Sequence, residues 1–89
     1  MQVTVRVMAT MSTSASAKLA FPGDRVTLAE LLQVFLHACP VRSGIRDGDG
    51  LRRDVRVFVG DRLVRHAEAS DVAVPDGAEV WLIPGTAGG

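Results

Sequence analysis

The sequence predicts an α+β domain in which one main helix packs on a mixed sheet of four to five strands. Residues 28–36 have the three- and four-residue apolar spacing of an amphipathic helix. Residues 3–7 and 55–59 alternate apolar with other side chains, and residues 79–83 form a nearly continuous apolar run, as strands do. Because a helix and a sheet each have an apolar side to bury, the two pack as layers around one core.

Length and charge exclude several classes of protein. The chain has 89 residues, 47% of them hydrophobic, and a formal net charge of zero. This length predicts one domain, and the zero charge argues against nucleic acid or an anionic membrane surface as the main partner. The N-terminal residues lack the apolar core of a signal peptide, and no run is long enough to span a bilayer. We therefore expect a cytoplasmic protein.

The N-terminal part predicts two strands joined by a loop. Residues 3–7 place valine at every second position, which is typical of a half-buried strand. Residues 10–16 are small and polar and predict a loop, and a short second strand follows over residues 17–21. Pro22-Gly23-Asp24 then turns the chain.

One helix follows this turn. Thr27 and Glu30 have the spacing of a capping box, in which each side chain satisfies a backbone N–H of the first turn. The apolar stripe of the helix consists of Leu28, Leu31, Leu32, Phe35 and Leu36. Pro40 cannot continue the helix, so we expect it to end after Cys39.

The middle of the chain predicts a loop and a hairpin. Residues 41–53 are rich in glycine and aspartate and predict a loop. Residues 55–59 alternate as a strand, Gly60-Asp61 fits a two-residue hairpin turn, and residues 62–65 return.

The final strand completes a recognisable order of elements. Residues 66–74 predict an irregular crossing with a short extended piece, and Pro75-Asp76-Gly77 predicts a turn. The apolar character of residues 79–83 predicts a strand in the sheet interior, beside the first strand. A hairpin, a helical crossover and further strands are the layout of a β-grasp fold, which we expect over residues 1–84.

A flexible tail is predicted after Pro84. It has almost no apolar surface to offset the backbone entropy that packing would cost. Its two terminal glycines leave it slim enough to enter a narrow channel. The tail consists of Gly85, Thr86, Ala87, Gly88 and Gly89.

These motifs resemble those of a known family. The turn and strand entry Asp76-Gly77-Ala78-Glu79-Val80, together with Pro84 and the Gly-Gly ending, resemble the ThiS/MoaD family of ubiquitin-like sulfur carrier proteins. The resemblance implies a carrier that is not itself an enzyme and binds no cofactor or metal of its own. Gly85 to Gly88 would enter the active site of a partner enzyme, and Gly89 would be the reacting residue.

The resemblance also implies the partners. An adenylating enzyme of the ubiquitin-activating type would convert the Gly89 carboxylate to an acyl-adenylate with MgATP. A sulfur donor, either a persulfide or sulfide, would displace AMP and leave a thiocarboxylate. A sulfur-accepting biosynthetic enzyme would then use this sulfur for thiamin, molybdopterin, cysteine or a sulfur-containing secondary metabolite. Two alternatives remain: a ubiquitin-like modifier conjugated to lysine, and a non-covalent β-grasp interaction module.

The strand pattern predicts a docking patch for these partners. If the alternating valines face the helix, the intervening apolar side chains face away from it and form an exposed patch near the base of the tail. Tryptophan and arginine are favoured anchors at protein interfaces. The predicted patch consists of Met8, Phe58, Leu63, Trp81 and Ile83, with Arg6, Arg56 and Arg65 at its rim.

Other chemically active residues carry weaker signals. Cys39 is expected to be a small buried side chain at the helix end, and His37 and His66 are isolated. Asp47-Gly48-Asp49-Gly50 lacks the later ligands of a calcium-binding loop. Lys18, the only lysine, is expected to be exposed. None of these patterns predicts a metal site or catalytic machinery.

Overall fold

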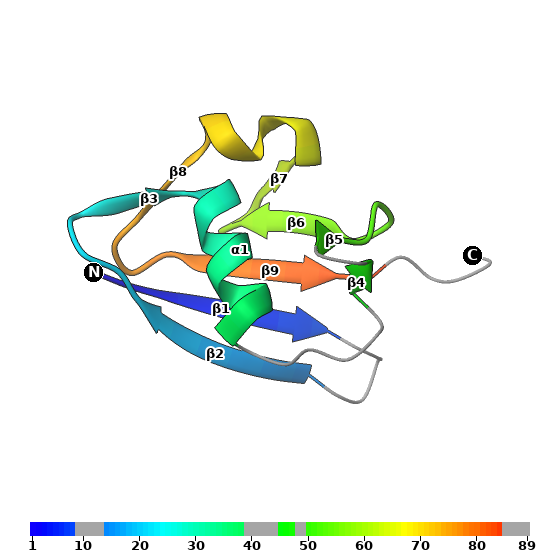
Figure 1. The fold of residues 1–89 in the computed structure, drawn as a ribbon, viewed down its shortest axis with the longest axis horizontal. Helices are drawn as coiled ribbons and strands as arrows, with labels where there is room; N and C mark the ends of the chain where they lie inside the picture. The colour runs from blue at the N-terminus through cyan, green and yellow to red at the C-terminus, as the bar shows by residue number, and fades with distance from the viewer. Residues whose placement is uncertain (9–13, 39–44, 48–49, 85–89) are drawn as a thin grey trace.

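The computed structural model describes residues 1–8, 14–38, 45–47 and 50–84, and Figure 1 shows an α+β arrangement of one main helix on a sheet. The sheet has five strands in the order β2-β1-β9-β6-β7. These strands are β1 (Gln2–Met8), β2 (Ser14–Ala20), β6 (Arg56–Val59), β7 (Arg62–Val64) and β9 (Glu79–Ile83), and the helix is α1 (Leu28–Ala38). The predicted mixed sheet and single main helix are therefore confirmed.

The last strand lies in the middle of the sheet. β9 pairs in parallel with β1 and antiparallel with β6, while β1–β2 and β6–β7 are antiparallel. Val80 is opposite Val5 on one side and Val59 on the other, and Leu82 is opposite Val57. In this position the side chains of β9 are flanked by those of a strand on each side, and the predicted place beside the first strand is confirmed.

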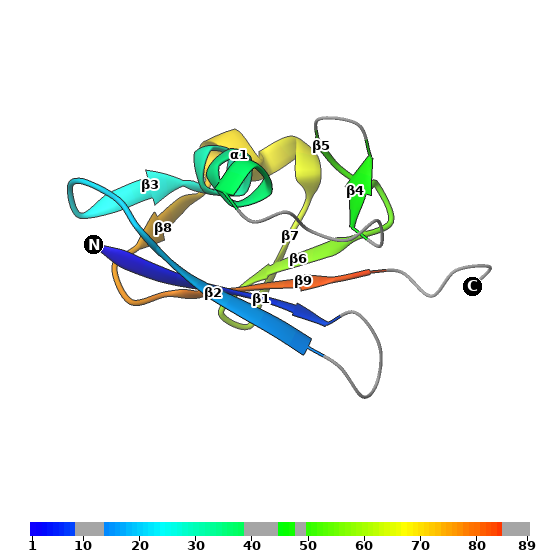
Figure 2. The ribbon, with the colours of Figure 1, turned by 60° about the horizontal axis from the view of Figure 1, so that its bottom comes forward.

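The core lies between α1 and one face of the sheet (Figure 2). The five predicted apolar residues of α1 are all buried. At the start of the helix, the backbone N–H of Glu30 donates to Thr27 Oγ1 at 3.2 Å, as half of a capping box does. The sheet side of the core is made mainly of valine and leucine from alternate strand positions: Val3, Val5, Val7, Leu19, Val57, Val64, Val80 and Leu82.

Smaller elements were incompletely predicted. β4 (Arg46–Asp47) and β5 (Gly50–Leu51) pair inside the predicted loop 41–53, where Ile45 is also buried. The second strand begins earlier than expected, at Ser14, because β1 remains paired with it as far as Met8. The crossing contains the 3-10 helix η1 (His66–Asp71) and the short strand β8 (Ala73–Pro75), which pairs with β3 (Arg25–Thr27).

The turn before β9 is tied to the first strand. Gly77 has a φ of 82°, which favours glycine. Its N–H donates to the Gln2 carbonyl at 2.8 Å, and the Gln2 N–H donates to Asp76 Oδ1, also at 2.8 Å. These bonds fix the start of β9 against β1. Separately, no helix within the described ranges has the length and hydropathy needed to cross a bilayer.

Candidate functional site

The candidate site is the sheet face that points away from α1, here called the outer face. Among the described elements, no helix or strand lies over this face (Figure 2). Side chains alternate along a strand, so the positions between the core residues point outward. The outer face of the described strands therefore carries five large apolar side chains, Met8, Phe58, Leu63, Trp81 and Ile83.

Strand register places three of these apolar side chains and one arginine in a continuous row across the sheet. Trp81 on β9 is opposite Phe58 on β6, and Phe58 is in turn opposite Leu63 on β7. On its other side Trp81 is opposite Arg6 on β1. Side chains directly opposite each other in neighbouring strands are in contact range. One residue from each of four strands thus forms a row with Trp81 at its centre, here called the outer row.

The apolar part of the outer face is accessible to a partner. Leu63 is 57% exposed and Met8 is 37% exposed, whereas Phe58, Trp81 and Ile83 are half-buried. Among the described elements, the half-buried side chains have their neighbours on the same face beside them and no further element over them. Large apolar side chains gathered in this way are typical of interaction surfaces.

Arg6 fixes the centre of the outer row. Its guanidinium carbon lies 5.4 Å from the centroid of the Trp81 ring, within the range of a cation–π contact. The same group donates to Glu79 Oε2 from Nε at 3.2 Å and from Nη2 at 3.1 Å. The Glu79 side chain is two positions from Trp81 and on the same face. Arg6 was predicted as a rim charge, and the structure places it instead on Trp81, with its charge paired.

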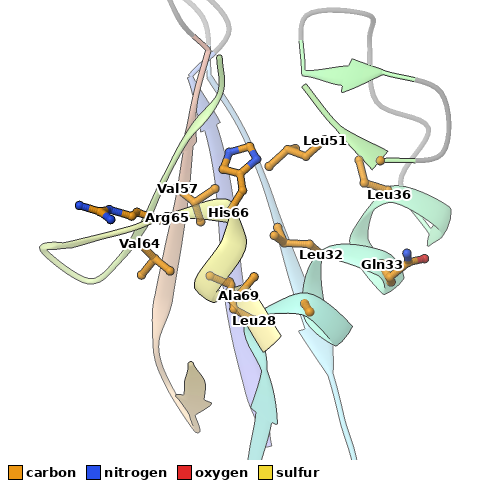
Figure 3. A pocket seen from close by; sticks show the side chains of 12 residues that line it. Leu28, Leu32, Gln33, Leu36, Leu51, Val57, Val64, Arg65, His66 and Ala69 are labelled. Carbon is orange, nitrogen blue, oxygen red and sulfur yellow. The ribbon is translucent and has the colours of Figure 1, made fainter. Parts of the chain in front are cut away.

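Arg56 and Arg65 bring positive charge to the other side of the row. Arg56 is exposed and opposite Ile83. The Arg65 side chain is 86% exposed and points away from α1 in Figure 3. Its Nε is 3.9 Å from Glu68 Oε1, and Arg62 shares the same carboxylate at 4.0 Å. Such long, solvent-exposed ion pairs are weak. The guanidinium groups of Arg56 and Arg65 are therefore available to a partner.

The root of the predicted tail adjoins the outer face. β9 ends at Ile83, whose side chain belongs to the outer face, and Pro84 follows. The tail residues themselves, Gly85 to Gly89, lie outside the described residues. The strand that precedes them is held by β1 and β6, so Ile83, its last residue, is fixed relative to Trp81.

A second feature, which the sequence did not indicate, is a crevice on the other side of the sheet. It has a volume of about 180 Å³ and is lined mainly by apolar residues of α1, β5, β6, β7 and η1 (Figure 3). His66 lies at this crevice, and its Nε2 is 2.6 Å from the Val55 carbonyl oxygen. Because a carbonyl only accepts, Nε2 must donate, and His66 links η1 to the segment before β6.

Those of the remaining candidates that the structure describes form no second chemical site. Lys18 is exposed on β2, and His37 is exposed in the last turn of α1. Cys39 lies outside the described residues. Within the part of the chain that the structure describes, no three His, Cys, Asp or Glu residues are grouped to hold a metal ion.

Comparisons of the chain with models of protein families, with curated proteins and with solved structures found no significant match.

Proposed function

We propose that this chain is a β-grasp sulfur carrier of the ThiS/MoaD type. The single observation that carries the proposal is the position of β9. This strand lies between β1 and β6, presents Trp81 at the centre of the outer row, and leads directly into Pro84 and the glycine-rich segment. A docking surface and a slim tail on one strand allow a partner to hold the body while the tail reaches its active site.

The proposed chemistry takes place at the Gly89 carboxylate. An adenylating partner joins this carboxylate to the α-phosphate of ATP and releases pyrophosphate, with Mg²⁺ bound to the nucleotide. Hydrosulfide then attacks the acyl carbon, AMP leaves, and a thiocarboxylate remains after loss of a proton. The carrier supplies the acyl group, and Gly88 and Gly89 present no side chain that would hinder the attack.

The outer face would supply the docking energy. Trp81, Phe58 and Leu63 offer apolar area at its centre, while Arg56 and Arg65 offer charge at its edge. Buried aromatic residues surrounded by a polar rim are typical of interface hot spots. Arg6 restricts the Trp81 ring before binding, which reduces the entropy lost when the interface forms.

Intact-mass measurement tests the proposal against its alternatives. The chain is incubated with ATP, Mg²⁺ and sodium sulfide in an extract of its native cells and then recovered. A sulfur carrier gains the mass of one sulfur in place of one oxygen. A protein modifier appears as higher-mass conjugates, and an interaction module keeps its mass.

Two variants separate the tail from the docking face. Deletion of Gly88-Gly89 abolishes the mass change and leaves the thermal stability nearly unchanged, because the proposed tail is not packed. Trp81→Arg strongly lowers the fraction of chains that gain the sulfur mass, and it lowers the thermal stability only slightly. Unfolding of Trp81→Arg would show that Trp81 is needed in the core, and a large stability loss on deletion would show a packed tail.

A further inference from the structure

We propose that the free edge of β2 is a strand-addition site for an extended segment of a partner protein that carries a carboxylate side chain. β2 and β7 are the two edge strands of the five-stranded sheet. The outward backbone N–H and C=O groups of an edge strand can pair with another strand. This site lies at the edge of the sheet, apart from the outer row and from the tail.

The two edges of the sheet are protected to different degrees. β7 has three residues, begins with Arg62 and is followed by Arg65. A strand this short offers few backbone groups to an added strand. β2 has seven residues, no proline or glycine, and one charged residue, Lys18. No described helix or strand lies along its far side in Figures 1 and 2.

The phase of the β1–β2 ladder shows which backbone groups are free. The Phe21 N–H donates to the Met1 carbonyl at 2.9 Å, and Gln2 is paired with Ala20. Hydrogen-bonded and non-bonded pairs alternate in an antiparallel ladder. The odd-numbered residues of β2 therefore bond to β1, and the even-numbered residues direct their N–H and C=O groups outward. These include Ser16, Lys18 and Ala20, all of which are exposed.

The side chains of β2 favour an added strand of opposite charge. Serine and alanine at positions 16 and 20 leave the outward backbone groups accessible. Lys18 lies between them and has no ion-pair partner among the residues that the structure describes. A carboxylate opposite Lys18 would supply a favourable cross-strand pair.

A second copy of the chain fits this edge less well. In the antiparallel register that pairs the full length of two β2 strands, Lys18 would be opposite Ser16 of the copy. The two Lys18 side chains would then be diagonal neighbours on one face of the joined sheet, where like charges repel. The ammonium group of Lys18 therefore favours a strand from a different protein that carries an acidic residue.

Amide chemical shifts of the ¹⁵N-labelled full chain test this site with two peptide probes. One probe is acetyl-Glu-Val-Glu-Val-Glu-Val-amide, and the control has lysine in place of glutamate. We expect the acidic probe to shift the amides of Ser16, Lys18 and Ala20 and to bind more tightly than the control. Lys18→Glu should lower the affinity for the acidic probe about fivefold and raise the affinity for the lysine probe.

A proline pair tests the backbone contribution. Ser16→Pro removes an outward N–H and keeps the bonds of β2 to β1, so it should abolish probe binding in a folded chain. Ala17→Pro removes an N–H that bonds to β1 and should destabilise the fold. Shifts confined to other elements, equal binding of the two probes, or self-association through β2 would each overturn the proposal. If Ser16→Pro does not fold, the Lys18→Glu comparison decides the question.

Discussion

Truncation of neighbouring residues on β9 should have unequal effects on stability. Leu82 is 0% exposed and lies opposite Val7 on β1 and Val57 on β6. Leu82→Ala should lower the free energy of unfolding by about 3 kcal/mol, because it leaves a cavity between two strands and the helix. Trp81 points to the other face, where Arg6 lies over its ring and Phe58 is its cross-strand neighbour.

The expected loss of unfolding free energy in Trp81→Ala follows from the interactions of Trp81 with Arg6 and Phe58. The cation–π contact with Arg6 is worth about 0.5–1 kcal/mol, and the cross-strand pair with Phe58 about 0.2–1 kcal/mol. Trp81→Ala should therefore cost about 1–2 kcal/mol, clearly less than Leu82→Ala. Urea unfolding monitored by circular dichroism measures both values, and an unchanged m-value shows that the comparison is valid. A larger loss for Trp81→Ala than for Leu82→Ala would contradict the assignment of the two faces.

Three further changes test local features of the fold. Thr27→Ala should lower the free energy of unfolding by about 1 kcal/mol, because the helix cap is lost. In urea unfolding the control Thr27→Ser should stay close to the wild type, and equal losses in the two variants would exclude the cap. Gly77→Ala should cost about 1–2 kcal/mol because its φ is positive; Gly50→Ala, without a positive φ, is the control, and equal costs would argue against backbone strain. Arg6→Ala should lower the free energy of unfolding by about 1–2 kcal/mol, because it removes both the cation–π contact and the exposed ion pair with Glu79. It should also alter the fluorescence of Trp81, the only tryptophan, and an unchanged spectrum would contradict the stacking.

Local patterns predicted the main elements of the fold. The apolar spacing of residues 28–36 and the capping residue Thr27 depend only on neighbours within the helix, so sequence alone located α1. The alternation of residues 3–7 reflects a strand with one face in the core, and the apolar run 80–83 reflects the central place of β9, whose outer side chains are half-buried. Alternation alone therefore predicts that Trp81 and Val80 lie on opposite faces, as the strand pairing confirms.

Contacts between distant segments could not be predicted from the sequence. β4 and β5 have two residues each, too few to show a period, and Ile45 lies beside glycine and charged residues. The Arg6–Glu79 pair joins residues 73 positions apart, and it depends on the parallel register of β1 and β9. Alternation put Arg6 on the outer face, but only register showed that it covers Trp81.

Fragment mass spectrometry of the C-terminal peptide most directly tests the central claim that Gly89 is the site of sulfur loading. The wild-type chain is incubated in native extract with ATP, Mg²⁺ and sodium sulfide, and the peptide containing residues 80–89 is fragmented. Our account predicts one sulfur in place of one oxygen on the terminal glycine, and no such change when ATP is omitted. The absence of an ATP-dependent sulfur on the terminal glycine would contradict it.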